Sequence, residues 1–164
     1  MKEDYPDFVS AAGALGSITE LDIDSLRLLY RLECSGEDFY NLIADRIGSP
    51  EAAVLLRKNA REERGHAERV RKVIGLKQGR AYEPSGTDLV RYAIVLPNTI
   101  APELLPMIVQ AELDGDRGYQ VWAEHETDPE VQRLLRQNGR EETGHGERVK
   151  QVMEILAGRP GQST

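Results

Sequence analysis

An internal duplication constrains this chain more than any other feature of its sequence. The stretch Glu62–His66 recurs 79 residues later as Glu141–His145, with only one of its five residues changed. Around it, the segments 50–73 and 129–152 share 15 identical residues out of 24. A repeat this close indicates two copies of one structural unit, in which the chemistry of the side chains is kept as well as the shape.

Residues that precede these stretches repeat at the same offset. Glu33 recurs as Glu112, and Tyr40 recurs as Tyr119. Each copy therefore holds one glutamate, one tyrosine and a Glu-x-x-His sequence. Four carboxylates and two imidazoles are the ligand number of a helical bundle that holds two metal ions. The candidate ligands are Glu33, Glu63, His66, Glu112, Glu142 and His145.

Four segments have the hydrophobic period of helices. Their apolar residues recur in alternating steps of three and four, which is the pattern of a helix with one buried face. The segments are 19–47, 50–77, 103–126 and 129–157. A short turn ending in proline separates the first two and the last two, and proline suits the first turn of a helix. Each pair is therefore predicted to form a helical hairpin.

The segment between the two hairpins, residues 78–102, differs in composition. It contains two glycines and three prolines, and we interpret it as a long crossover with one short helix at 88–96. Residues 1–18 are interpreted as a loose arm and residues 158–164 as a short tail. We therefore predict an all-α protein whose single domain, residues 19–157, is a four-helix bundle. An elongated helical repeat is the alternative, but it needs three or more units to bury its faces.

Hairpin geometry predicts that the candidate ligands converge. In two antiparallel helices, residues at equal distances from the turn lie side by side, and the midpoint between Glu33 and His66 falls in the first turn. The midpoint between Glu112 and His145 falls in the second turn. A glutamate and a histidine three residues apart share one helix face. Each early glutamate should therefore face the Glu-x-x-His of its partner helix, near the middle of the bundle.

A metal site is favoured over a solvated charged face, although Glu-x-x-His is common on helices. The candidate ligands lie on the predicted inward faces, flanked by leucine and valine, and no lysine or arginine shares those positions. Buried carboxylates without counter-charges are very costly, so four at one level require protons, cations or a metal. Carboxylates with imidazoles favour iron or manganese, with zinc as a substitute. We predict that Glu63 and Glu142 bridge two ions, each of which also binds one histidine.

The bulk composition argues against several classes of partner. The formal net charge is −7 and the pI is about 5.1, whereas nucleic acids and acidic membranes attract basic surfaces. The single cysteine, Cys34, argues against a disulfide framework. No apolar stretch has the length that spans a bilayer, and the N-terminus lacks the apolar core of a signal peptide. We expect a cytoplasmic protein without a nucleic-acid or membrane partner, and we expect a homodimer.

The repeated segments resemble a known family. EERGHAERV and EETGHGERV, with Glu33 and Glu112 seven residues ahead of Tyr40 and Tyr119, are similar to the ferritin-like superfamily, and most of all to its rubrerythrin and bacterioferritin branch. The resemblance covers about residues 20–157. It implies a ferritin-like four-helix bundle with a carboxylate-bridged diiron site that reacts with dioxygen or hydrogen peroxide. It also implies the same six ligands.

Three departures limit this resemblance. Rubrerythrins usually carry one more ligand glutamate where this chain has Gly115, and Gly36 is its mate in the first hairpin. The four-cysteine rubredoxin domain of rubrerythrins is absent, which implies that the electron donor is a separate protein. Bacterioferritins carry a haem-ligating methionine where this chain has Arg64, so we expect no haem.

Tyrosines and asparagines also repeat beside the candidate ligands. Tyr40 and Tyr119 are our candidates for catalytic side chains, either through a hydrogen bond to a ligand carboxylate or as redox-active groups. The alternative is that they are ordinary buried aromatics. Asn59 and Asn138 lie one turn before the bridging glutamates, and we expect them to hydrogen-bond to the backbone of the crossover. Trp122 is expected to be an ordinary core residue.

Two further repeated pairs have two interpretations each. Gly36 and Gly115 either leave open space above the metals for a small oxidant or substrate, or allow close helix packing. Glu62 and Glu141 either accept the second N–H of the opposite ligand histidine or are exposed partners of Arg69 and Arg148.

Several functions therefore stay open. The first is a diiron oxidoreductase that reduces peroxide, oxidises incoming iron or, with a pocket for an organic substrate, acts as an oxygenase. The second is a metal-binding bundle without turnover, in which the ions only stabilise the core. The third is a subunit of an iron-storing assembly, which the short tail makes the least favoured.

Overall fold

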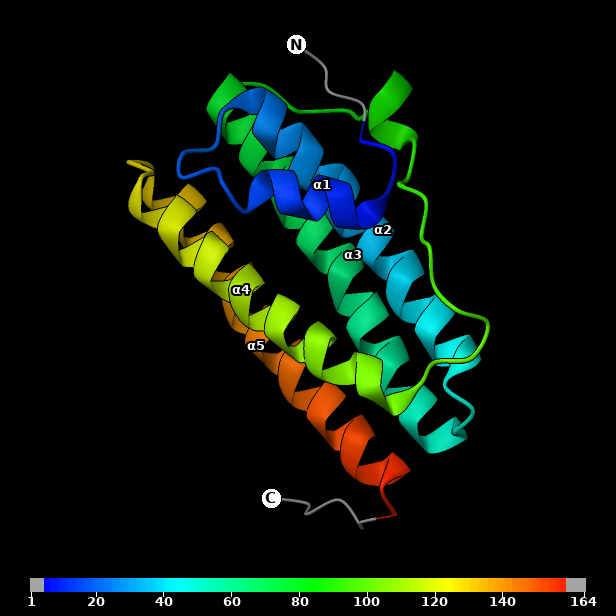
Figure 1. The fold of residues 1–164 in the computed structure, drawn as a ribbon. Coiled ribbons are helices and arrows are strands. Elements are labelled where there is room, and N and C mark those ends of the chain that lie inside the picture. Colours follow the sequence, from blue (N-terminus) through cyan, green and yellow to red (C-terminus); the bar gives the residue numbers. More distant parts are fainter. Residues whose placement is uncertain (1–4, 159–164) are drawn as a thin grey trace.

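The computed structural model describes residues 5–158, and every regular element in that range is a helix (Figure 1). Four long helices form two antiparallel hairpins. The first hairpin contains α2 (Ile23–Arg46) and α3 (Pro50–Gln78), and the second contains α4 (Leu105–Glu124) and α5 (Pro129–Leu156). The prediction of an all-α bundle built from two duplicated hairpins is confirmed. None of the described helices combines the length and the hydrophobicity needed to cross a membrane.

The two tight turns follow from the residues that the sequence places there. Ser49 and Asp128 are in extended conformation, and their side chains accept backbone N–H groups from the first turns of α3 and α5. Pro50 and Pro129 occupy the first helical positions, where a missing N–H is not needed. Gly48 has a φ of 73°, a left-handed conformation that glycine adopts without strain.

The predicted arm, residues 1–18, contains a helix that the sequence analysis did not predict. This helix, α1 (Phe8–Leu15), packs on α2. Its Ala11 and Leu15 are buried. A helix of eight residues is marginal by itself, so contacts with the bundle stabilise it, and its sequence alone carries little signal. The first four residues of the arm, and the predicted tail after Gly158, lie outside the described residues.

The crossover follows α2 in extended conformation rather than forming the helix predicted at 88–96. Figure 1 shows it in green along the side of α2, after a short 3-10 helix, η1 (Gly86–Leu89), and before a second, η2 (Pro102–Leu104). Side chains of α2 bind its backbone. Arg31 donates to the carbonyl of Val90, Ser35 Oγ accepts the N–H of Tyr92, and Arg46 donates to the carbonyl of Leu96. These bonds occupy backbone groups that a helix would need.

Asp88 anchors the crossover to α2. It is 5 % exposed, and its two carboxylate oxygens accept from Nε and Nη2 of Arg27 at 3.0 and 2.9 Å. The hydroxyl of Tyr82 donates to the same carboxylate at 2.7 Å. Burial by itself would raise the pKa of Asp88, but the hydrogen bonds from Arg27 and Tyr82 outweigh it and lower that pKa. The ionised carboxylate therefore fixes the start of the crossover.

The apolar core is divided in two by a polar level. In α2, Leu26 and Leu29 belong to one apolar cluster and Ile43 belongs to the other. Between them lies Glu33, which is buried. Between the same two clusters, α3 buries Glu63 and His66, and α5 buries Asn138, Glu142 and His145. Helices α3 and α5 pack against each other, and this contact brings the polar levels of the two hairpins together.

Replacing Asp88 with asparagine should destabilise the fold. We expect the free energy of unfolding to fall by about 1.5–3 kcal/mol, the usual contribution of hydrogen bonds to a charged group. Urea unfolding followed by circular dichroism measures this change. Asp24→Asn is the matched control, because Asp24 lies 4.0 Å from the same guanidinium but its side chain is 83 % exposed. Equal losses in the two variants would contradict the anchoring role of Asp88.

Candidate metal centre

The polar level of the bundle brings the six candidate ligands together. Glu33 comes from α2, Glu112 comes from α4, and α3 and α5 each contribute one Glu-x-x-His. The four glutamates are 5–9 % exposed, and the two histidines are 0 % exposed. The duplicated sequence therefore becomes one buried cluster to which all four long helices contribute.

The cluster consists of two overlapping groups of ligand atoms. In each group, atoms from four residues lie within 4.8 Å of one another. One group contains Glu33, Glu63, His66 and Glu142, and the other contains Glu63, Glu112, Glu142 and His145. Glu63 and Glu142 belong to both groups, whereas each of the other residues belongs to one. This is the sharing that two bridging carboxylates require.

The two oxygens of each shared carboxylate face different histidines. Oε1 of Glu142 lies 3.3 Å from Nδ1 of His66, and its Oε2 lies 3.1 Å from Nδ1 of His145. Oε2 of Glu63 lies 3.6 Å from Nδ1 of His66, and its Oε1 lies 3.2 Å from Nδ1 of His145. Each carboxylate thus lies across the midline of the cluster with one oxygen on each side.

Each histidine presents Nδ1 to a set of three carboxylate oxygens. The third oxygen is Oε2 of Glu33, 3.3 Å from His66, or Oε2 of Glu112, 3.4 Å from His145. Across the described part of the chain, neither Nδ1 finds a hydrogen-bonding partner of suitable geometry, although both atoms are buried. A nitrogen lone pair surrounded by carboxylate oxygens lacks only a cation between them. The donor set of oxygen and nitrogen suits iron or manganese.

The other ring nitrogen of His66 is held by Glu141. Nε2 of His66 lies 3.1 Å from Oε2 of Glu141, which also accepts from Arg69, while Gln137 donates to its Oε1 at 3.1 Å. Burial by itself would raise the pKa of Glu141, but the hydrogen bonds from His66 and Gln137 and the charge of Arg69 lower it to about 2. An ionised carboxylate only accepts hydrogen bonds. In the neutral imidazole the ring proton therefore lies on Nε2, and Nδ1 keeps its lone pair for a metal.

The second copy has the same partners, although Nε2 of His145 lacks a hydrogen-bonding partner of suitable geometry within the described residues. Nε2 of His145 lies 3.2 Å from Oε2 of Glu62, which also accepts from Arg148. The contact with His145 and the charge of Arg148 lower the pKa of Glu62 against the effect of burial. Each glutamate therefore lies against Nε2 of the opposite histidine, as one interpretation predicted. Each also forms an ion pair with an arginine, but Arg69 and Arg148 are only 19 % and 14 % exposed rather than at the surface. The two arginines recur at the same offset and were expected as exposed partners of these glutamates, and the structure places each of them against the glutamate of the opposite hairpin.

The asparagines bind the facing histidine rather than the crossover. Nδ2 of Asn59 donates to the backbone carbonyl of His145 at 3.3 Å, and Nδ2 of Asn138 donates to that of His66 at 3.3 Å. The same two arginines donate to the side-chain oxygens of the asparagines. The predicted bond to the crossover is wrong, because both asparagines lie on the faces where α3 and α5 meet. They align the two histidine-bearing turns with each other.

Each tyrosine binds the early glutamate of the opposite hairpin. The hydroxyl of Tyr119 donates to Oε1 of Glu33 at 2.5 Å, and the hydroxyl of Tyr40 donates to Oε1 of Glu112. In both cases the tyrosine occupies one carboxylate oxygen while the other, Oε2, faces a histidine. Burial and the nearby carboxylates raise the pKa of both hydroxyls well above its usual range. The tyrosines therefore keep their protons and hold the glutamates in orientation.

The two repeated glycines have different surroundings. A Cβ atom at Gly36 would lie 2.8 Å from Oε2 of Glu63, whereas one at Gly115 would lie 3.6 Å from Cγ of Glu142. The first distance is a clash and the second is an ordinary contact. Gly36 therefore makes room for a shared carboxylate, while the side chain of alanine fits at Gly115.

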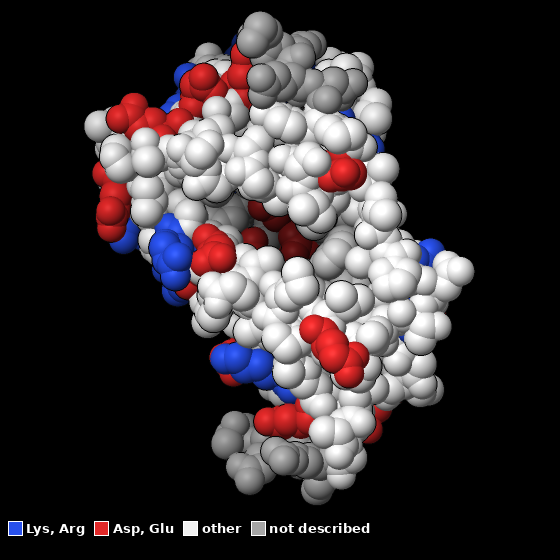
Figure 2. All heavy atoms as spheres, viewed as in Figure 1, with Lys and Arg blue, Asp and Glu red and all other residues white. Residues whose placement is uncertain are grey.

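A hollow leads from the surface toward buried acidic groups. Figure 2 shows it between α1 and α4 in this view, with acidic atoms at its base and mostly uncharged atoms around its rim. The cluster glutamates retain 5–9 % exposure while the histidines retain none. The carboxylates therefore form the accessible side of the cluster, and the imidazoles lie behind them.

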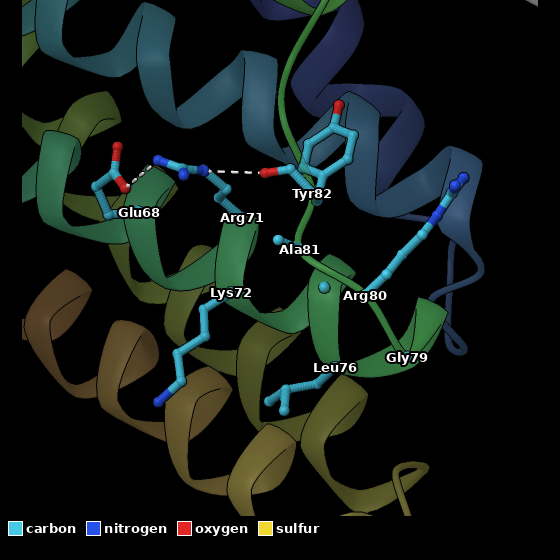
Figure 3. Close-up of a pocket in the computed structure, with 9 residues that line it drawn as sticks. Glu68, Arg71, Lys72, Leu76, Gly79, Arg80, Ala81 and Tyr82 are labelled. Atoms are coloured by element: carbon cyan, nitrogen blue, oxygen red, sulfur yellow. Dashed lines mark hydrogen bonds and ion pairs between the residues drawn. The ribbon is translucent and has the colours of Figure 1, made fainter.

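A second cavity lies away from the cluster. It has a volume of about 650 Å³, follows the last turns of α3 (Figure 3), and contains none of the candidate ligands. Arg71 in its wall donates to the backbone oxygen of Tyr82 and to the carboxylates of Glu68 and Glu83. This arginine is occupied by protein groups, and the cavity has no part in the metal centre.

Burial leaves the metal-free cluster holding protons. It raises the pKa of Glu33 to about 8 and that of Glu112 well above its usual range, and the neighbouring carboxylates add to the effect. The surrounding carboxylates raise the pKa of His66 and His145 even though burial opposes the charge. Positive charge is thus needed among these carboxylates, and protons supply it when no metal is bound.

Comparisons with known proteins place this arrangement among relatives. The family model described as Rubrerythrin matches residues 24–153, which include all six candidate ligands. A solved structure, a hypothetical protein from Pyrococcus furiosus, is similar with a TM-score of 0.65 at 19 % sequence identity. The match covers 83 % of this chain and 90 % of that chain. At this identity the likeness concerns the fold alone. No curated protein matches the sequence.

The metal-free protein should lose stability as the pH rises from 4.5, the ordinary pKa of a glutamate, to about 8. In this interval folded Glu33 and Glu112 hold protons that the unfolded chain has released. That stabilisation disappears as the pH passes the folded-state pKa, about 8 for Glu33. Thermal unfolding of metal-free protein across the interval measures the effect. A melting temperature that climbs steadily over this range would show that the assignment of the protons is wrong.

Replacing Glu141 with glutamine should weaken metal binding without removing a ligand. The neutral amide no longer fixes the proton of His66 on Nε2, and we expect the affinity to fall about 10- to 100-fold. Anaerobic titration with ferrous or manganous ions measures it. Glu147→Gln is the control, because Glu147 is on the same helix but is exposed and pairs with Lys150. Equal affinities in the two variants would remove Glu141 from the site.

Proposed function

The chain belongs to the rubrerythrin family, and from that membership we propose that it is a diiron oxidoreductase that reacts with hydrogen peroxide or dioxygen. The observation that carries the proposal is the orientation of Glu63 and Glu142, whose two oxygens each face different histidines. We propose two iron ions as the cofactor, with manganese or zinc as substitutes and without haem. The proposed ligands are the six residues of the cluster.

Charge balance supports two divalent ions rather than one. Four ionised glutamates carry four negative charges, and two divalent ions carry four positive charges. With both imidazoles neutral, the filled cluster has no net charge, which is the least costly state for a buried site. A single divalent ion would leave two charges for protons to neutralise.

The residues around the cluster suit a reaction with a small oxidant. When bound, two ferrous ions would supply one electron each, enough to break the O–O bond of peroxide without freeing a radical. Tyr119 and Tyr40 hold one oxygen of Glu33 and Glu112, so that the other oxygen stays directed toward a histidine. The hollow with acidic atoms at its base is the proposed approach for peroxide or dioxygen (Figure 2).

Turnover also needs partners outside the chain. We propose that a separate electron-donor protein returns the two electrons, and that the protein is a homodimer. The alternatives from other classes are a metal-binding bundle without turnover and a diiron oxygenase acting on an organic substrate. Access through the hollow favours a reaction over a purely structural metal, because an ion that only fixes the core needs no opening.

Metal stoichiometry tests the ligand assignment. Glu63→Gln and Glu142→Gln should weaken the binding of both ions, because each residue belongs to both ligand groups. Glu33→Gln and Glu112→Gln should each weaken the binding of one ion and leave the binding of the other unchanged, because each residue belongs to one group. Anaerobic ferrous titration with elemental analysis of the four variants measures this. Four variants with the same loss would contradict the bridging assignment.

The reaction is tested with the iron-loaded wild type. Peroxide added to the anaerobic ferrous protein should oxidise the iron rapidly and give near-ultraviolet charge-transfer bands, in a ratio of one peroxide to two irons. Tight binding of two irons that peroxide does not oxidise would favour the metal-binding bundle without turnover.

A further inference from the structure

A pair of aromatic residues connects one side of the cluster with the surface. We propose that Tyr119 and Trp122 form an electron-transfer relay that links the Glu33 side of the metal centre to the connection between α1 and α2. The proposal rests on the proposed redox function. It gives Trp122 a role beyond packing and makes the two sides of the duplicated centre different.

The inner end of the relay is in contact with the cluster. The hydroxyl of Tyr119 donates to Oε1 of Glu33 at 2.5 Å, and the residue is 2 % exposed. Its ring meets that of Trp122 edge to face, with 5.2 Å between the ring centroids and 77° between the planes. Aromatic rings at this separation are in direct contact. No other side chain is needed between the ligand carboxylate and the indole.

The outer end of the relay lies under the chain that joins α1 to α2. Nε1 of Trp122 donates to the backbone carbonyl of Ile18 at 2.7 Å, and the side chain retains 6 % exposure. A carbonyl accepts the hydrogen bond but is too weak a base to take the indole proton. An oxidised Trp122 therefore keeps its N–H and its positive charge, which makes it a stronger oxidant than a deprotonated indole radical.

The other half of the molecule lacks this path. The position equivalent to Trp122, 79 residues earlier, is Ile43. Tyr40 instead meets Phe39, with 5.6 Å between ring centroids, and Phe39 stacks on Phe8 at 5.1 Å. Phenylalanine rings are much harder to oxidise than tyrosine or tryptophan, so electron transfer stops at Tyr40. The chain contains one tryptophan, and the duplication places it beside only one of the two tyrosines.

The relay passes one electron inward and leaves the protein unchanged. Tyr119 gives an electron to the oxidised centre and its hydroxyl proton to Oε1 of Glu33. Trp122 returns an electron to Tyr119, which takes the proton back along the same hydrogen bond. The indole radical cation that remains is reduced by a one-electron donor at the surface, such as a thiolate or the electron-donor protein. One electron has then moved from the donor to the centre, with no net proton transfer.

Pulse radiolysis of the metal-free protein above pH 8, where the Glu33 carboxylate is ionised and can accept the proton of Tyr119, tests the contact between the two rings. Azide radicals remove one electron from Trp122 and become azide ions. The same coupling then runs in the opposite direction, as Tyr119 reduces the indole radical. We expect the absorption of the tryptophanyl radical to decay while that of a tyrosyl radical appears. This process should be first order, with a rate independent of protein concentration.

Two matched variants identify the tyrosine. Tyr119→Phe should lose the transfer phase, whereas Tyr40→Phe should keep it at the wild-type rate. Each variant removes one tyrosine and its hydrogen bond to a cluster glutamate, so their structural effects are comparable, and circular dichroism checks that both fold. Transfer that survives in Y119F, or that is lost equally in Y40F, would overturn the relay.

The wild type alone also decides the question if a variant does not fold. A tryptophanyl signal that decays at a rate proportional to protein concentration, with no tyrosyl radical, would equally exclude the relay. Because the experiment uses metal-free protein, a negative result leaves the metal titrations of the proposed function unaffected, and the two proposals fail separately.

Discussion

Mutual repulsion among four buried carboxylates is the constraint on which the rest of this structure depends. The two imidazoles beside these carboxylates are fully buried, so water cannot compensate the negative charges. Protons or cations must compensate them instead. Within residues 5–158, no lysine or arginine forms an ion pair with any of the four inner glutamates. The arginines of the site, Arg69 and Arg148, stop at the outer carboxylates, Glu141 and Glu62. Exchangeable protons or cations must therefore supply the compensating positive charge.

The supporting hydrogen bonds make the centre a property of both hairpins together. His66 in the first hairpin is held by Glu141 of the second, and Tyr119 of the second hairpin holds Glu33 of the first. The other copy has the reciprocal pairs. Neither hairpin alone contains a complete set of ligands with their supports. Formation of the site and packing of α3 against α5 are therefore the same event, which couples metal binding to the stability of the bundle.

The internal symmetry holds for the ligands and ends just beyond them. Glu37 in the first hairpin forms ion pairs with Arg64 and Arg91, whereas its equivalent, Asp116, accepts a hydrogen bond from Thr143 at 2.6 Å. The aromatic neighbours differ in the same way between the two halves. The proposed binuclear site requires equivalent ligands, because each of its two ions would need the same donors. No such requirement acts on the residues around the ligands, so the surroundings of the two sides can differ.

The sequence by itself determined the four long helices, their pairing into hairpins and the set of side chains that meet. These features depend on the helical period, on the turn residues and on the distance of each residue from its turn, all of which are local. The prediction that Glu63 and Glu142 bridge two ions also came from the repeat, and in the structure both residues belong to both groups of ligand atoms. The sequence did not reveal α1, whose eight residues are too few to form a helix without the bundle.

Only the tertiary structure decided how the two hairpins face each other. It assigned each tyrosine to the glutamate of the opposite hairpin, and it directed Asn59 and Asn138 to histidine carbonyls rather than to the crossover. It also kept residues 88–96 extended, because side chains of α2 bind their backbone. The physical reason is common to all three. The register within a hairpin is set by its own turn, whereas contacts between hairpins depend on packing between helix faces that no local pattern specifies.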